Sequence, residues 1–463
     1  MPRAAAEPPD KAVSKYLARW AEPEAALADG IPESFGHALI VPAYGERESL
    51  FHLLASIPAG PAGPVLIVVV VNARKDSPAA AHESNAAVRE RFVKELPTPR
   101  ALSETPPART HELPGGRLVW IDRASPGHFL PEGQGVGLAR KIGNDLALRL
   151  WAAGRLSSPW IHNTDADVLL PRDYFEQTAS LDAGDAGAVL YFYEHRFEEN
   201  PDLALAGRLY EISLRYDVLG LDWADSPYAY QSMGSCIAIP PRAYAWVRGF
   251  PRKNAAEDFY VLDKLAKVGS IGRLAGSPLL LEGRPSDRVP FGTGRALRDL
   301  SGGRRSLANF RLTHPLVFAH LAAWLRVLDR LAETGGDAIR ALDELPAASP
   351  YFRTDLLRES LEKMGVSGAI AEAREKSRDA GTLRRHLHTW FDAFRTRKLM
   401  HLLRNGGLGT LSWREALAEA PFTDLAASTE EAPEVLRRLL AERERGLSTR
   451  SAGVPQNGKP IET

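Results

Sequence analysis

Apolar residues in the first two thirds of the chain fall into short runs separated by helix-like stretches. The runs His37–Val41 and Val65–Val71 have the length of strands, and the second contains only Val, Leu and Ile, as expected for a strand buried on both faces. Glu46–Ile57 follows the first run with apolar residues at helical spacing, and Ala79–Leu96 follows the second as another predicted helix. This β-α-β-α order predicts parallel strands joined by crossover helices.

The same pattern continues to about residue 305 and then changes. Further strands are predicted at Arg117–Asp122, Trp160–Asn163, 186–193, Gly234–Ile239 and Pro278–Leu281, and further helices at Leu138–Ala153, 201–219 and Ala256–Val268. Residues 97–116 contain five prolines and end in a Gly-Gly pair, which predicts an irregular insertion. Beyond residue 305 only helices are predicted, at Leu316–Leu331, Asp337–Leu345, Arg353–Lys363, Gly381–Leu403 and Glu430–Arg445.

These elements predict an α/β fold, in which helices flank a mostly parallel sheet and an α-helical region follows. We expect a loosely held, partly helical lead-in at residues 1–35, the sheet domain at 36–305, the helical region at 306–450 and a disordered tail at 451–463. Apolar residues at helical spacing in the C-terminal region are most simply core packing, with acceptor binding or a homodimer contact as the alternatives.

Composition narrows the class of protein. The 463 residues include 58 basic and 58 acidic side chains, so the basic excess typical of nucleic-acid-binding proteins is missing. The longest apolar run, Val65–Val71, is far shorter than the roughly 20 residues that cross a membrane. The single cysteine, Cys236, and a polar N-terminus without the pattern of a signal peptide favour a reducing compartment. We therefore expect a soluble, cytoplasmic protein.

Two aspartates carry the strongest chemical signal. Asp165 and Asp167 directly follow the predicted strand Trp160–Asn163, and residues two apart in an extended segment face the same way. Open α/β sheets bind ligands at this end of their strands. Two close carboxylates repel each other, and a hard cation such as Mg²⁺ or Mn²⁺, shared with substrate phosphates, relieves the repulsion. The alternative is an ordinary solvated turn.

Several short motifs then point to a family. In chain order they are Ile40–Glu46, Gly133–Lys141, Asn163–Val168, Met233–Ser235 and Glu257–Leu262. In this order and spacing, over roughly residues 36–295, the chain resembles the family 2 glycosyltransferases, which have the GT-A fold. The resemblance implies an enzyme that binds a nucleoside-diphosphate sugar, such as a UDP- or GDP-sugar, together with Mg²⁺ or Mn²⁺.

The resemblance assigns one group of residues to the nucleotide base. Pro42, Tyr44 and Glu46 correspond to the segment that surrounds the base, although Glu46 in the first turn of a helix is favourable in any protein. Asn72 stands where the family often has an aspartate that binds the base, and Asp76 is a second candidate. The identity of the base stays open.

A second group corresponds to the diphosphate. Arg140 and Lys141 match cations at the start of a helix, and a helix N-terminus itself suits an anion, but a basic surface helix would look the same. Arg284 and Arg288 lie in a Gly- and Pro-rich stretch that corresponds to a basic loop over the leaving diphosphate, with a structural turn as the alternative. The resemblance adds Asp165 to the donor contacts.

The resemblance also implies the catalytic residues. Asp258, supported by Glu257, corresponds to the base that takes a proton from the acceptor hydroxyl, although acidic residues are favoured at any helix start. Gly234 lies in the segment that corresponds to the family's small-residue strand facing the acceptor, where Cys236 is more simply a small buried residue than a nucleophile. His314 is a candidate third metal ligand, with a place at a helix start as the alternative.

The leading hypothesis is a metal-dependent glycosyltransferase that moves one sugar to an acceptor hydroxyl with inversion. The sequence leaves open a retaining glycosyltransferase, a sugar nucleotidyltransferase, and a non-catalytic protein that binds a nucleotide sugar or a partner. Residues Pro42–Glu46 occupy the place where a nucleotidyltransferase usually has a Gly-rich basic loop, which argues against that alternative.

Overall fold

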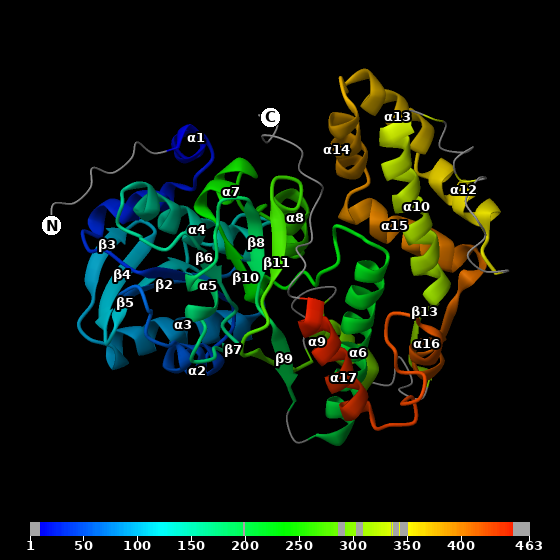
Figure 1. The fold of residues 1–463 in the computed structure, drawn as a ribbon. Helices are drawn as coiled ribbons and strands as arrows, with labels where there is room; N and C mark the ends of the chain where they lie inside the picture. Colours follow the sequence, from blue (N-terminus) through cyan, green and yellow to red (C-terminus); the bar gives the residue numbers. More distant parts are fainter. Residues whose placement is uncertain are drawn as a thin grey trace. The chain divides into compact units, whose positions relative to one another are not determined.

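The structure is a computed structural model that describes residues 10–197, 200–285, 292–301, 309–334, 336, 342 and 351–447. The chain divides into two compact units, which can be followed by their labels in Figure 1. The sheet unit contains the residues up to Arg196 together with Ser232–Glu282, and the helical unit contains Phe197–Gln231 and the residues from Gly283 onward. Within the described ranges, no helix is long and apolar enough to cross a membrane.

Among the described residues, a nine-stranded sheet forms the centre of the sheet unit. Across the sheet the strands are β11 (Ser270–Arg273), β8 (Ala186–Leu190), β10 (Ile237–Ile239), β6 (Ile161–Asn163), β1 (His37–Ala43), β2 (Val65–Asn72), β5 (Gly116–Arg123), β4 (Pro107–Leu113) and β3 (Arg100–Glu104). The pairings reverse β10 and β4 and leave the other seven strands pointing in one direction. The predicted fold class, with a mostly parallel sheet and a helical C-terminal region, is confirmed.

Helices cover both faces of this sheet. In Figure 1, α1 (Lys11–Arg19), α4 (Val136–Ala152) and α7 (Pro241–Trp246) lie on one side, and α2 (Ser49–Ser56) and α3 (Ala79–Glu95) lie on the other. A Cβ atom on Gly143 would lie 2.4 Å from the side chain of Ile40, so this glycine allows α4 to pack directly on β1. The remaining elements of the unit are a 3-10 turn at Pro23–Gly30, α5 (Glu176–Ala179), a 3-10 turn at Gly234–Cys236, α8 (Glu257–Leu265) and the small sheet of β7 (Val168–Leu169), β12 (Leu279–Glu282) and β9 (Tyr193–Arg196).

Two expectations for the sheet unit were wrong. Residues 97–116 are not irregular, because β3 and β4 extend the sheet as an antiparallel hairpin next to β5. Their prolines stand at strand ends, where no ladder hydrogen bond is lost. The described part of the lead-in is also not loose, because α1 buries Val13 and Tyr16 completely.

The helical unit packs around one apolar core. The elements are α6 (Pro201–Trp223), α9 (Thr293–Ser301), β13 (Arg311–Thr313), α10 (Pro315–Thr334), α12 (Thr354–Lys363), α13 (Val366–Glu375), α14 (Ala380–Trp390), α15 (Ala393–Leu403), a π-turn at Arg404–Leu408, β14 (Thr410–Ser412), α16 (Trp413–Glu419) and α17 (Pro433–Gly446). Trp324 and Phe318 of α10 and Tyr216 of α6 are fully buried in this core. Core packing, the simplest of the three roles considered for these helices, accounts for these apolar residues.

The helical unit differs from the predicted elements in three ways. Helix α6 belongs to it, so its boundary does not follow the one predicted near residue 305. The predicted helix Gly381–Leu403 is two helices, because the carboxylate of Asp392 accepts a hydrogen bond from the Arg395 N–H (3.0 Å) and starts a new helix. Two short strands, β13 and β14, pair where only helices were expected. The predicted tail at 451–463 and most of the predicted helix Asp337–Leu345 lie outside the described residues.

Candidate functional site

The carboxyl ends of the central parallel strands meet at one edge of the sheet. β6 pairs in parallel with β1 and antiparallel with β10, so that Asn163, the last residue of β6, lies opposite Ile237, the first residue of β10. The residues just after β6 and just before β10 therefore share this edge. Asp165 and Gly234, which are both candidate site residues, lie there for this reason.

Arg140 of α4 is the buried centre of this edge. Only 2% of its side chain is exposed, and its guanidinium contacts three acceptors from two segments. It donates to Glu257 Oε1 (2.9 Å) and to the carbonyl oxygen of Thr164 (3.3 Å), and it forms a close ion pair with Asp165. Burial opposes its charge, but the carboxylates of Asp165 and Glu257 prevail and raise the pKa of Arg140 above its ordinary value. Arg140 thus joins the segment after β6 to the start of α8.

Glu257 and Asp258 are neighbours in sequence but differ in their surroundings. Glu257 is buried and paired with Arg140, and burial raises its pKa while Arg140 opposes the rise. Asp258 is half-buried, and its carboxylate accepts hydrogen bonds from the backbone N–H groups of Gly234 (3.0 Å) and Phe259 (2.7 Å). Burial and the charge of Glu257 raise the pKa of Asp258 to about 7. A carboxylate with a pKa in this range can accept a proton near neutral pH.

Asp165 and Asp167 lie in the turn between β6 and β7, and both are half-buried. The Glu282 N–H donates to the Asp167 carbonyl oxygen (3.2 Å), which ties this turn to β12. Two carboxylates in a partly open turn suit Mg²⁺ or Mn²⁺, which commonly take one or two protein carboxylates and fill their other positions with water and substrate phosphates. The donor chemistry therefore fits the cation that the sequence implied.

His314, the candidate third metal ligand, has a hydrogen-bond partner of its own. Among the described residues, no group of three or more His, Cys, Asp or Glu side chains is arranged to hold a metal ion. His314 precedes α10 in the helical unit, and its Nδ1 accepts a hydrogen bond from the Leu316 N–H (3.1 Å). This is the helix-start role that the sequence offered as its alternative.

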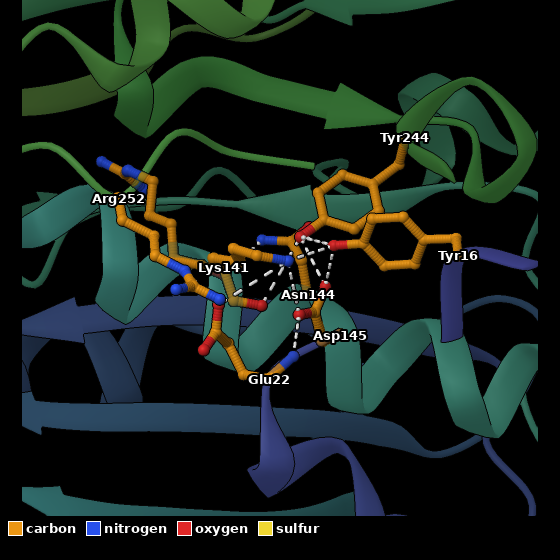
Figure 2. Close-up of polar contacts among 8 residues, drawn as sticks. Tyr16, Glu22, Lys141, Asn144, Asp145, Tyr244 and Arg252 are labelled. Carbon is orange, nitrogen blue, oxygen red and sulfur yellow. Dashed lines mark hydrogen bonds and ion pairs between the residues drawn. The ribbon is translucent and has the colours of Figure 1, made fainter. Parts of the chain in front are cut away.

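Lys141 does not point to the edge that holds Asp165. Its ammonium is buried on the other side of α4, where it contacts the Tyr16 hydroxyl and Asp145 Oδ2 (2.8 Å) (Figure 2). Tyr16 and Tyr244 both donate to Asp145 Oδ1, over 2.5 and 2.8 Å, and the Glu22 N–H donates to Oδ2 (2.7 Å). A buried cation with these partners fastens the N-terminal segment to α4 and has no capacity left for a diphosphate.

The glycine-containing segment at residues 133–137, where α4 begins, packs against residues 251–254. The Gly137 N–H, in the first turn of α4, donates to the Lys253 carbonyl oxygen (3.0 Å). A Cβ atom on Gly137 would lie 2.2 Å from the Pro251 carbonyl oxygen, and one on Gly135 would lie 3.0 Å from Asn254. These glycines therefore let the 251–254 segment cross the helix N-terminus, which we had expected to be open to phosphate.

The candidate base-binding residues lie at the ends of β1 and β2. Pro42 is buried inside β1, Glu46 is buried beyond it and Tyr44 is half-buried. The amide nitrogen of Asn72 donates to the carbonyl oxygens of Ala43 (3.1 Å) and Val70 (3.2 Å), so it ties β2 to β1. Both donor hydrogens of this amide are therefore used within the sheet, and only its oxygen is left for a base.

The other candidate residues are less central. Asp76 is exposed and forms an ion pair with Arg74 (2.8 Å). Cys236 is buried, and burial raises the pKa of its thiol to about 12, which makes it a poor nucleophile. Arg284 is half-buried and belongs to the helical unit, and Arg288 lies outside the described residues.

Two features of the site were not found from the sequence. Asn144 of α4 donates to the Asn163 side-chain oxygen (2.7 Å), which fixes α4 beside the end of β6. Gly234 makes room for the guanidinium of Arg140, because a Cβ atom there would lie 2.4 Å from Nη2. The spacing of residues along one chain carries no signal for either contact.

Comparison with known proteins gives only distant similarities. Neither a protein-family model nor a curated relative matches the chain. Among solved structures, the crystal structure of Staphylococcus aureus TarS 1-349 is 11% identical, with a TM-score of 0.32 and 90% of each chain covered. The same protein in complex with UDP-GlcNAc is 11% identical, with a TM-score of 0.31, and 90% of this chain and 91% of that chain are covered. The mannosyltransferase PcManGT from Pyrobaculum calidifontis, in complex with GDP-Man and Mn²⁺, is 16% identical, with a TM-score of 0.32, and 95% of this chain and 94% of that chain are covered. At these values the similarities do not identify the activity of this chain.

Proposed function

We propose that the protein is a glycosyltransferase that moves a single sugar from a nucleoside-diphosphate sugar to an acceptor hydroxyl. The observation that carries the proposal is the contact of Arg140 with both Asp165 and Glu257. Because of this contact, a pair of carboxylates suited to a divalent cation and a carboxylate with a pKa of about 7 lie at one edge of the sheet. Open α/β sheets bind their ligands at this edge.

In the proposed reaction, Asp258 takes the proton of the acceptor hydroxyl as its oxygen bonds to the anomeric carbon of the donor. The bond from that carbon to the diphosphate breaks, and the nucleoside diphosphate leaves with the bonding electrons. The Gly234 and Phe259 N–H groups hold the Asp258 carboxylate in place for this step. Bound at Asp165 and Asp167, Mg²⁺ or Mn²⁺ would neutralise charge on the leaving diphosphate.

The donor site is tested by thermal stability with a panel of nucleoside diphosphates and their sugars, with and without Mn²⁺. A ligand that binds only the folded protein stabilises it by about 2.7 kcal/mol at a hundredfold excess over its Kd. We expect one nucleotide to raise the Tm in the presence of Mn²⁺, and Asp167→Ala to remove this shift. The matched control is Asp182→Ala, which removes an exposed aspartate between α5 and β8. No shift with any nucleotide would refute the proposed donor site.

The chemical step is tested separately. With the donor identified, Asp258→Asn is expected to retain the nucleotide-dependent Tm shift and to lose turnover by a factor of about 100 or more. Unchanged turnover would reject Asp258 as the base. Proton NMR of the first product formed would show whether the anomeric configuration is inverted, as a reaction with a single base requires.

A further inference from the structure

The glycine at position 234 is explained by its contact with the Arg140 side chain and not by its backbone conformation. A Cβ atom on Gly234 would lie 2.4 Å from Arg140 Nη2 and 2.8 Å from Cζ, which is closer than real Cβ contacts. The φ angle of Gly234 is not in the left-handed region, so an alanine could adopt the same backbone conformation. The guanidinium is held by three acceptors and is not free to move aside, so space for it is what favours a glycine at this position.

We propose that Arg140 is a positioning residue that sets the geometry between the Asp165 carboxylate and the Glu257–Asp258 segment, and that Gly234 serves to admit its guanidinium. This inference rests on the proposed function and departs from the family resemblance, which would place Arg140 on the donor diphosphate. Arg140 is 2% exposed and already contacts two carboxylates and the Thr164 carbonyl oxygen. To reach a donor it would have to leave Glu257 buried without its partner.

The planar fork of a guanidinium explains why arginine is needed here. Nε contacts Glu257, Nη1 contacts the Thr164 carbonyl and Nη2 contacts Asp165, so three nitrogens serve three acceptors in fixed directions. A lysine ammonium has one nitrogen on a flexible stem and cannot span the same acceptors. Gly234 in turn donates its N–H to Asp258, so the backbone that makes room for Arg140 also holds the proposed base.

The test is a double-mutant cycle of Gly234→Ala and Arg140→Lys, measured by turnover, donor KM, Mn²⁺ affinity and Tm. We expect Arg140→Lys to lower kcat by about 100-fold while donor KM changes by less than about threefold, because the lost contact orients reacting groups. Gly234→Ala should lower kcat similarly in the wild-type background, where the new methyl displaces the guanidinium. In the Arg140→Lys background it should have little further effect, because the displaced group is absent. Gly368→Ala, whose added methyl would meet no atom within 4 Å, is the control.

Two results would overturn the inference. If Gly234→Ala lowers kcat or raises the acceptor KM equally in both backgrounds, Gly234 contacts the acceptor directly. If Arg140→Lys raises the donor KM and leaves kcat unchanged, Arg140 binds the donor. The Tm cycle needs no substrate, so non-additive Tm changes would support the packing of Arg140 on Gly234 even if every donor failed, and that outcome would reject only the proposed function.

Discussion

The most informative stability prediction concerns Asp258, because its electrostatic environment opposes the charge that the proposed reaction needs. Its pKa in the folded protein is about 7, against 3.8 for a free side chain. The folded protein therefore holds a proton between pH 4 and pH 7 that the unfolded chain releases. The stabilisation from this group is fully present below about pH 4 and is lost as the pH rises through 7.

The magnitude follows from this shift. Each pH unit between the two pKa values changes the free energy of unfolding by about 1.4 kcal/mol, so raising the pH from 5 to 8 costs up to about 2.7 kcal/mol. Asp258 is half-buried, and nearby solvent reduces this to about 1–2 kcal/mol. Asp258→Asn removes the titration but leaves one of the two N–H groups poorly satisfied, which costs about 1 kcal/mol at every pH.

We therefore expect the free energy of unfolding of Asp258→Asn, relative to wild type, to rise by about 1–2 kcal/mol when the pH is raised from 5 to 8. The assay is urea denaturation at both pH values with a metal chelator present, because a bound cation would lower the pKa of Asp258. Asp76→Asn is the control, because the hydrogen bond from Arg74 lowers the pKa of Asp76 and its stabilisation stays constant above pH 5. A stability difference between Asp258→Asn and wild type that does not change with pH would refute the reasoning.

Two further predictions concern buried groups of the sheet unit. Glu257→Gln should also gain stability relative to wild type as the pH is raised from 5 to 8, because burial raises the pKa of Glu257 despite its pair with Arg140; urea denaturation at both pH values measures this change, and a difference that stays constant with pH would contradict the raised pKa. Burial lowers the pKa of His37 to about 4. As the pH falls below 6.5, the unfolded chain therefore binds a proton at this residue before the folded protein does. This lowers the free energy of unfolding by up to about 3 kcal/mol at pH 4. His37→Phe should reduce this acid sensitivity in a Tm series from pH 7 to pH 4.5, and an unchanged slope would show that another group causes it.

The fold was largely predictable because β2 is an uninterrupted apolar run of strand length, and because strand-length and helix-length stretches alternate over the first part of the chain. The hairpin of β3 and β4 was missed because its prolines read as breakers, whereas in the structure they stand at strand ends and turns. The break between α14 and α15 was missed because apolar residues continue through it, and the cap by Asp392 is a single hydrogen bond that periodicity does not detect. Local signals therefore located most elements but not their interruptions.

The candidate site was predictable where chemistry follows directly from position along a strand. Asp165 and Asp167 follow β6, and strand order alone places them at the carboxyl edge of the sheet. Adjacent residues on a helix point about 100° apart, so Arg140 and Lys141 cannot face the same way. The packing of α8 and α1 against α4 decides their partners, because Arg140 contacts Glu257 of α8 and Lys141 contacts Tyr16 of α1. The use of Gly137 against Lys253 is likewise a contact between distant segments, and sequence spacing cannot show it.

The network around Asp145 has a consequence for how the protein is made. Its members are Tyr16, Glu22, Lys141 and Tyr244, and Tyr16 and Tyr244 are separated by 228 positions along the chain. During synthesis at about 5–20 residues per second, α1 leaves the ribosome more than ten seconds before α7 can join it. The packing of α1 is therefore completed only after more than half of the chain has been made, and until then α4 but not α7 can cover its apolar face.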